Sequence, residues 1–252
     1  MTIVLVHGNP ETEAIWDDLV PHLRFDEVIR LSPPGFGCAI PPGFECSTDA
    51  YRDWLAGELG KLTQPIDIVG HDWGGGHVMR IAMERSDLIR SWTSDILGCF
   101  DADYVWHDMA QAWQTADVGE QAVAQMASTP AETRAQRFES LGMTSAIARK
   151  IAAGANREVG QAILALYRSA AQPVMHDLGA GLPRAAAKPG LALIATEDHY
   201  CGGEILARRS AERAGAKVAV LEGAGHWWMC QQPKQGADAI NAFLAGLNYR
   251  AA

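Results

Sequence analysis

The chain has 252 residues, of which 48% are hydrophobic and 20% charged, so it is long enough to bury a sizeable core and too apolar to be disordered. Its formal net charge of −9 disfavours nucleic acid and anionic membranes as partners. No apolar run is long enough for a bilayer, no signal peptide precedes the first strand-like segment, and the five cysteines lack CxxC spacing, so we expect a cytoplasmic protein with reduced thiols.

Strand-like and helix-like segments alternate in the first part of the chain. Runs of β-branched and other apolar residues predict strands at 2–6, 28–31, 66–69 and 89–97. The last of these is the least apolar, because it contains Ser94 and Asp95. Apolar residues at helical spacing predict helices between the strands, at 11–23, 48–62 and 77–83.

The pattern changes from residue 98 to residue 189, where strand-like runs stop and Ala-rich helical segments take over. We interpret this stretch as a helical cap inserted in a core formed by residues 1–97 and 190–252. The core pattern then resumes, with a strand at 190–195, a helix at 204–214, a strand at 217–221 and a helix at 238–247. The alternation predicts an α/β fold with a mostly parallel, doubly wound sheet.

One stretch, Ile66-Asp67-Ile68-Val69-Gly70-His71-Asp72-Trp73-Gly74-Gly75, combines a buried strand, a glycine-flanked turn and the start of a helix. This is the setting of a nucleophile elbow, in which small flanking residues tolerate a strained backbone and hold the central side chain up. The central residue here is Asp72, and a carboxylate in that place attacks carbon to form an alkyl ester. The alternative is a glycine-rich turn with a solvated aspartate.

Three candidate catalytic residues follow three predicted strands in the order Asp72, Asp198, His226. In this order His226 acts as the general base on water, and Asp198 orients its ring and stabilises the charged form. Two other carboxylates compete with Asp198 as the catalytic acid, its neighbour Glu197 and Asp95, which follows the strand after the elbow.

These motifs, together with His7-Gly8-Asn9-Pro10 and Pro34-Gly35-Phe36-Gly37, resemble the α/β-hydrolases with an aspartate nucleophile, the haloalkane dehalogenases and epoxide hydrolases. The resemblance covers nearly the whole chain, although these enzymes usually carry extra strands before the one that ends at His7. It implies the α/β-hydrolase fold with its inserted helical cap, no cofactor, and a small, neutral, apolar substrate that reacts with water. We expect a monomer or a homodimer.

The resemblance favours a haloalkane dehalogenase. In that family, an asparagine and a tryptophan at the positions of Asn9 and Trp73 hold the departing halide. An amide and an indole N–H are suited to this because they meet an anion without carrying charge. The backbone N–H groups of the same two residues are expected to stabilise the oxyanion that forms when the ester on Asp72 is hydrolysed. The segments 112–120 and 166–169 also resemble dehalogenase caps.

An epoxide hydrolase is the first alternative, because those enzymes protonate the epoxide oxygen with cap tyrosines. Tyr167 fits this role, Tyr104 is a possible second acid, and Trp106 is a possible pocket residue. The segment 225–227 also resembles epoxide hydrolases. Asp95 and the pair 167–168 suggest a fluoroacetate-type dehalogenase as a further alternative.

Two more interpretations follow from the remaining residues. Trp73 and Gly76 stand where a fluoroacetate-type enzyme is expected to carry arginines that clamp its substrate, which counts against that alternative. A non-catalytic ligand-binding protein of the same fold is the last alternative, and an intact triad argues against it. The other histidines are scattered without metal-ligand spacing, so we predict no metal site.

Overall fold

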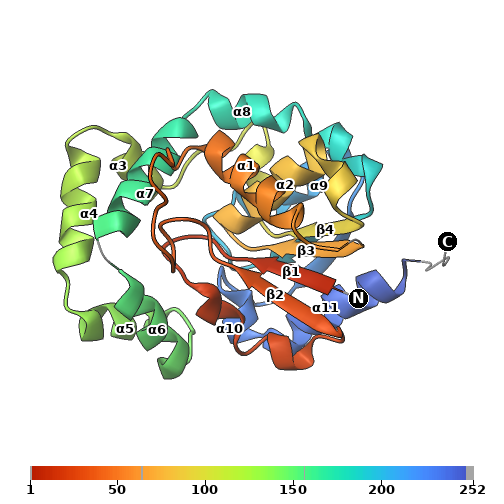
Figure 1. The fold of residues 1–252 in the computed structure, drawn as a ribbon, viewed down its shortest axis with the longest axis horizontal. Helices are drawn as coiled ribbons and strands as arrows, with labels where there is room; N and C mark the ends of the chain where they lie inside the picture. Colours follow the sequence, from red (N-terminus) through yellow and green to blue (C-terminus); the bar gives the residue numbers. More distant parts are fainter. Residues whose placement is uncertain (1, 64, 156, 248–252) are drawn as a thin grey trace.

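The computed structural model describes residues 2–63, 65–155 and 157–247. At its centre is a parallel sheet in the order β2-β1-β3-β4-β5-β6 (Figure 1). Its strands are β1 (Thr2–Val6), β2 (Glu27–Leu31), β3 (Ile66–Gly70), β4 (Ser91–Ser94), β5 (Gly190–Ala195) and β6 (Lys217–Leu221). The predicted α/β fold with a mostly parallel sheet is confirmed.

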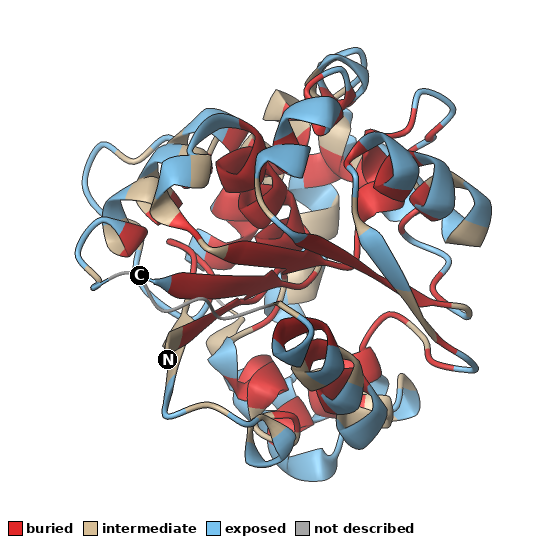
Figure 2. Ribbon diagram, turned by 90° about the vertical axis from the view of Figure 1, so that its right-hand side faces the viewer, coloured by how far each residue is buried: buried red, intermediate tan, exposed pale blue. Residues whose placement is uncertain are grey.

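Helices cover both faces of the sheet, and the central strands are buried between them (Figure 2). This double burial explains the uninterrupted apolar run of β5 and the burial of every residue of β3. One face carries α1 (Thr48–Leu59), α2 (Trp73–Glu84) and α9 (Gly203–Arg213), and the other carries α10 (Trp228–Gln231) and α11 (Pro233–Ala245). None of the helices in the described parts of the chain has the length and apolar character that a membrane crossing requires.

Three predicted elements differ from the structure. The helix at 11–23 is wrong, because the segment forms two 3-10 turns, Glu13–Trp16 and Val20–His22, and Pro21 within it has no backbone N–H for a helix. The strand at 89–97 is shorter, because Asp95 turns its carboxylate toward neighbouring loops. The last helix begins at Pro233, a residue type that is favourable in the first turn.

The chain between β4 and β5 is helical, and its helices α3 to α7 lie beyond the carboxyl ends of the strands, whereas α8 leads back over the helices of one sheet face toward β5 (Figure 1). Its helices α3, α4 and α7 pack together, as do α5 and α6. Their bounds are α3 (Asp108–Gln114), α4 (Val118–Ser128), α5 (Ala131–Ser140), α6 (Ser145–Gly154), α7 (Arg157–Ser169) and α8 (Val174–Gly179). The assignment of this insertion as a cap over a core stays a prediction.

The strand order determines where loops gather. From β1 the chain first moves to β2 on one side, and later enters β3 on the other side of β1. The loops after β1 and β3 therefore diverge and leave a crevice at the carboxyl edge, which is where open α/β sheets bind ligands. Asn9 follows β1 and Asp72 follows β3 at this edge.

Candidate active site

Asp72 stands at the turn between β3 and α2 with φ 50° and ψ −131°, a conformation that L-residues rarely adopt. The close packing of this turn requires glycine on both sides. A Cβ at Gly70 would lie 2.4 Å from the carbonyl oxygen of Gly74, and a Cβ at Gly74 would lie 2.2 Å from that of Val6. The sequence therefore forms the strained elbow that its glycine spacing predicted.

The two carboxylate oxygens of Asp72 face different groups. Oδ1 accepts a hydrogen bond from the backbone N–H of Asn9 at 2.9 Å, and Oδ2 lies 3.6 Å from Nε2 of His226. Gly8 permits this approach, since a Cβ there would lie 2.1 Å from Oδ1. Burial opposes ionisation, but the hydrogen bond and charge of His226 hold the pKa of Asp72 below its usual value. Asp72 is thus held in its ionised, carboxylate form.

His226 and Asp198 form the second half of the site. Nδ1 of His226 lies 2.8 Å from Oδ2 of Asp198, whose other oxygen accepts a hydrogen bond from the backbone N–H of Tyr200 at 2.8 Å. Burial opposes both charges, yet the pair raises the pKa of His226 well above its usual value and lowers that of Asp198 to about 2. Of the three candidate acids, Asp198 contacts His226, Asp95 contacts another histidine, and Glu197 is exposed.

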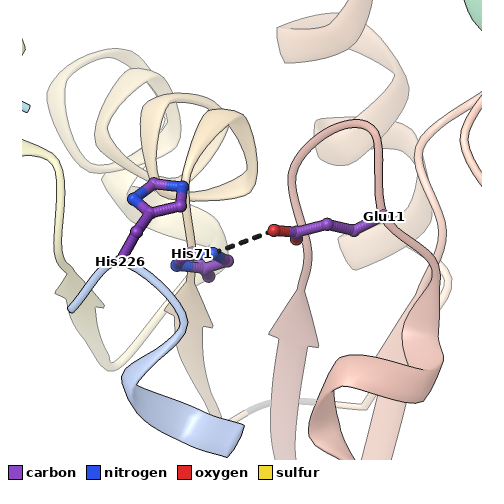
Figure 3. A group of neighbouring side chains, drawn as sticks. All are labelled: Glu11, His71 and His226. Atoms are coloured by element: carbon purple, nitrogen blue, oxygen red, sulfur yellow. Dashed lines mark hydrogen bonds and ion pairs between the residues drawn. The ribbon is translucent and has the colours of Figure 1, made fainter. Parts of the chain in front are cut away.

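That other histidine is His71, a buried residue that sequence reasoning missed. Its Nδ1 lies 2.5 Å from Oδ2 of Asp95, and its Nε2 lies 3.1 Å from Oε1 of Glu11. Figure 3 shows the bond to Glu11 and the ring of His226 beside that of His71, with ring centroids 4.6 Å apart. Burial disfavours its charge, but the charges of Glu11 and Asp95 raise the pKa of His71 to about 10. His71 is therefore an imidazolium held between two carboxylates.

Both carboxylates are fixed by further donors from neighbouring loops. The indole N–H of Trp227 donates to Oε1 of Glu11 at 2.5 Å, and that of Trp228 donates to Oδ2 of Asp95 at 2.7 Å. Asp95 also accepts the backbone N–H of Asp72 at 3.1 Å, so this network ends at the elbow itself. The only sequence signal for it was position, because each member follows a predicted strand.

A cavity of about 20 Å³, room for one water molecule, adjoins Asp72. Its wall is mostly aromatic, and none of the described residues that line it is an arginine. The rings of Trp73 and Trp106 are stacked with centroids 5.8 Å apart, and Tyr167 meets Trp73 edge-on at 5.5 Å. The aromatic lining residues are Trp73, Tyr104, Trp106, His107, Tyr167 and Tyr200.

The polar atoms of these aromatic residues have different partners. The hydroxyl of Tyr104 donates to the carbonyl of Tyr200 at 2.9 Å, and the indole N–H of Trp106 donates to that of Ala170 at 3.2 Å. Both groups are thus committed to the backbone. Tyr167 is buried, and burial together with the charge of Asp72 raises its pKa well above the usual value, so its hydroxyl stays protonated.

His107 is a second lining residue that sequence reasoning missed, since it was grouped with the scattered histidines. Its Nδ1 accepts the backbone N–H of Ala110 at 3.3 Å and so caps α3. Burial lowers the pKa of His107, so the neutral ring carries its proton on Nε2.

Asn9 is the other notable polar group beside the elbow. The residue is 5% exposed, and neither the oxygen nor the nitrogen of its side-chain amide has a hydrogen-bond partner among the described residues. A buried amide without a partner costs about 1–3 kcal/mol, so an unpaired amide next to the predicted nucleophile calls for a ligand.

Comparison with known proteins places this geometry in context. The model of the alpha/beta hydrolase family matches residues 3–239. The protein named probable oxidoreductase EphD from Mycobacterium tuberculosis is 31% identical over 123 residues, which are 45% of this chain and 21% of that protein. Haloalkane dehalogenase 2 of the same organism is 28% identical over 206 residues, 77% of this chain and 64% of that protein. The chain therefore spans about a fifth of the length of EphD and somewhat under two thirds of the length of haloalkane dehalogenase 2.

Among solved structures, epoxide hydrolase A of Mycobacterium thermoresistibile superposes with a TM-score of 0.77 at 21% identity. The match covers 98% of this chain and 92% of that one. At this identity the likeness concerns the fold alone.

Proposed function

Because this chain belongs to the alpha/beta hydrolase family, we propose that it is a hydrolase whose reaction runs through an alkyl ester on Asp72. Oδ2 of Asp72 attacks the substrate carbon, and the leaving group departs with the electron pair of the broken bond. Oδ1 becomes the carbonyl oxygen of the ester and stays in contact with the backbone N–H of Asn9, from which it is 2.9 Å away. That N–H then stabilises the oxyanion during hydrolysis.

The charge on His226 changes in the course of this cycle. In the free enzyme, burial opposes its protonation, and Asp198 and Asp72 together raise the pKa of the imidazole. Ester formation removes the negative charge of Asp72, so the pKa of His226 falls and the ring loses its proton. The neutral ring then takes a proton from the water that attacks the ester, and Asp198 stabilises the imidazolium that forms.

Halide displacement is the reaction that we favour, which makes the enzyme similar to haloalkane dehalogenases. The observation that carries this proposal is the buried amide of Asn9 without a partner beside the nucleophile. A halide accepts hydrogen bonds from the amide NH2 and from the indole of Trp73. The ring of Tyr167 lies edge-on to the indole in the free enzyme, so a halide bound to the indole N–H lies beside that ring.

Epoxide hydrolysis is the second candidate, and Tyr167 favours it. Its protonated hydroxyl lines the same cavity as Asp72, where it can protonate the alkoxide released on ring opening. Tyr104 is less suited to assist, because its hydroxyl already donates to a backbone carbonyl. The insertion acts as the cap in either reaction, and aromatic side chains of the cavity wall move to admit a substrate larger than water.

The test is a parallel assay of the purified protein on a series of bromoalkanes and a series of epoxides, with halide release and diol formation measured on the same sample. Halide release that falls at least about tenfold in Asn9→Ala is the expected result. Diol without halide would reverse the choice and make Tyr167 the acid. If neither halide nor diol is formed, both proposed reactions are wrong.

A further inference from the structure

Two buried cysteines lie beside the predicted triad. Cys99 is in the 3-10 turn Leu97–Phe100 after β4, and Cys201 is in the loop between β5 and α9. Both line the cavity next to Asp72, and the thiol of Cys99 together with burial raises the pKa of Cys201 well above its usual value. The proposed reaction uses neither thiol.

Cys201 also contacts the proposed base and its acid. The sulfur of Cys201, a carboxylate oxygen of Asp198 and a ring nitrogen of His226 all lie within 4.8 Å of one another. We propose that these three side chains bind one thiophilic divalent cation such as Zn²⁺, with the thiol of Cys99 available as a fourth donor. No local sequence pattern indicates this site, because Asp198 and Cys201 lie in the loop after β5 and His226 lies in the loop after β6.

The donor set suits the cation. Thiolate, imidazole and carboxylate are the ligands of four-coordinate zinc sites, and sulfur selects a soft cation over Mg²⁺ or Ca²⁺. The loops that carry the donors are packed tightly, since a Cβ at Gly98 would lie 2.1 Å from the carbonyl oxygen of Cys201. Gly202 and Gly203 follow with φ 80° and 73°, so glycine is needed for the turn that places Cys201.

A second group of possible ligands, Glu11, His71 and His226, also has its donor atoms within 4.8 Å of one another (Figure 3). It is less suited to a cation. It contains no sulfur donor, and Nδ1 of His71 is engaged by Asp95, which lies outside the group, whereas the carboxylate that engages Nδ1 of His226 is Asp198, itself a ligand of the proposed site. The cavity side of His226, where Cys201 lies, is therefore the side on which a cation binds.

Binding involves proton release and no redox change. The cation displaces the thiol proton of Cys201 and the proton that His226 shares with Asp198, and both protons go to solvent. With His226 and Asp198 on the metal, neither can serve the hydrolytic step, so the bound cation inhibits turnover reversibly. The inhibition rests on the proposed function, whereas the binding does not.

The experiment uses Co²⁺ as a spectroscopic probe. The intact, chelator-treated protein is titrated with Co²⁺, and thiolate-to-cobalt charge transfer and the visible bands of tetrahedral Co²⁺ are recorded. We expect saturation at one equivalent, and loss of these bands on addition of Zn²⁺. Cys201→Ser should lose the charge-transfer band, and His226→Gln should weaken Co²⁺ binding by more than about 100-fold, since loss of even a supporting group costs 10–100-fold.

Two control variants identify the thiol. Cys38→Ser removes the exposed thiol and Cys46→Ser removes a buried thiol outside the cavity, and both should bind Co²⁺ as the wild type does. Circular dichroism verifies that each variant is folded. A band that survives in Cys201→Ser and disappears in Cys38→Ser would overturn the proposal, as would a wild type without a band. If the bands appear as expected and Zn²⁺ leaves halide and diol release unchanged, the site stands and the proposed catalytic role of His226 falls.

Discussion

The cavity beside Asp72 has a floor and a roof that are built differently. The floor consists of polar side chains at the carboxyl ends of the strands, and they hold one another through charged hydrogen bonds. The roof consists of aromatic side chains of the helical insertion, packed ring against ring. By the floor we mean Asp72, which lines the cavity, and the polar side chains behind it, Glu11, His71, Asp95, Asp198 and His226. The roof residues, which all line the cavity, are Tyr104, Trp106, His107 and Tyr167.

This difference separates two tasks. A charged, fully hydrogen-bonded group has one favourable arrangement, because any buried charge that loses its partner is costly. The hydrogen bonds of the aromatic group join uncharged side chains to the backbone, so the group can repack without leaving a buried charge unpaired. We infer that the floor fixes the reaction and the roof selects the substrate. The following changes test this separation, and those in the floor should have the larger effects.

Asp72→Asn should have the largest effect. The amide keeps the shape of the side chain, and asparagine tolerates the positive φ of 50° at the elbow, so the fold should persist. Turnover should fall by at least about 10⁴-fold, as for other nucleophile replacements. Steady-state product release measures this, and a variant with activity close to that of the wild type would refute the ester mechanism.

His226→Gln should stop the cycle after its first step. The carboxylate of Asp72 remains a nucleophile, but no base activates water, so the alkyl ester should accumulate. Intact-protein mass spectrometry after mixing with substrate should show the added alkyl group, and peptide mapping should locate it on Asp72. Asp198→Asn is the matched variant and should slow hydrolysis less. Rapid turnover by His226→Gln would remove His226 from its role.

His71→Gln tests the floor as a structural unit. It leaves Glu11 and Asp95 buried without their shared cation, which should lower the free energy of unfolding by about 3–5 kcal/mol. Urea denaturation measures the loss. Lys234→Gln is the control, because it removes an exposed ion pair with Asp238 and should cost less than about 1 kcal/mol. Equal losses of stability in the two variants would mean that His71 does not form charged hydrogen bonds with Glu11 and Asp95.

The pKa of His71 also predicts a pH dependence. It rises from 6.5 in the unfolded chain to about 10 in the fold, because the charges of Glu11 and Asp95 overcome burial. The folded protein thus binds an extra proton between these values, and the stabilisation is complete below pH 6.5 and is lost as pH rises through about 10. His226 acts in the same direction. The urea midpoint of the wild type should therefore fall more steeply over this range than that of His71→Gln.

The sequence predicted the floor better than the roof, for physical reasons. Three residues, Asp72, Asp198 and His226, lie in short loops after apolar strands. The order of strands in the sequence was therefore enough to predict that they lie at one edge of the sheet. The bond between Glu11 and His71 joins residues 60 positions apart, and no local pattern encodes it. Glu11 also accepts a hydrogen bond from the backbone N–H of Gly8, and the segment after it forms a 3-10 turn in place of the predicted first helix.

The roof was harder to predict because its chemistry depends on which atoms meet after the helices have packed. The sequence predicts Tyr167 as a candidate acid and Tyr104 as a possible second one, but it does not show which hydroxyl is bound elsewhere. The structure shows that Tyr104 donates to a backbone carbonyl, whereas the ring of Tyr167 adjoins Trp73. The size of the cavity likewise follows from the contacts of several rings and from no single motif.

Tyr167→Phe should have the smallest effect if the roof only selects substrates. A halide leaves as an anion and needs no proton, so halide release should change by less than about tenfold, whereas an alkoxide from an epoxide needs a proton donor and diol formation should fall by about 10²–10⁴-fold. Tyr104→Phe is the control, because it removes a backbone hydrogen bond and should cost about 1 kcal/mol of stability without either kinetic effect. A large loss of halide release in Tyr167→Phe would show that the roof takes part in the chemistry, because the hydroxyl would then belong to the halide site with Asn9 and Trp73.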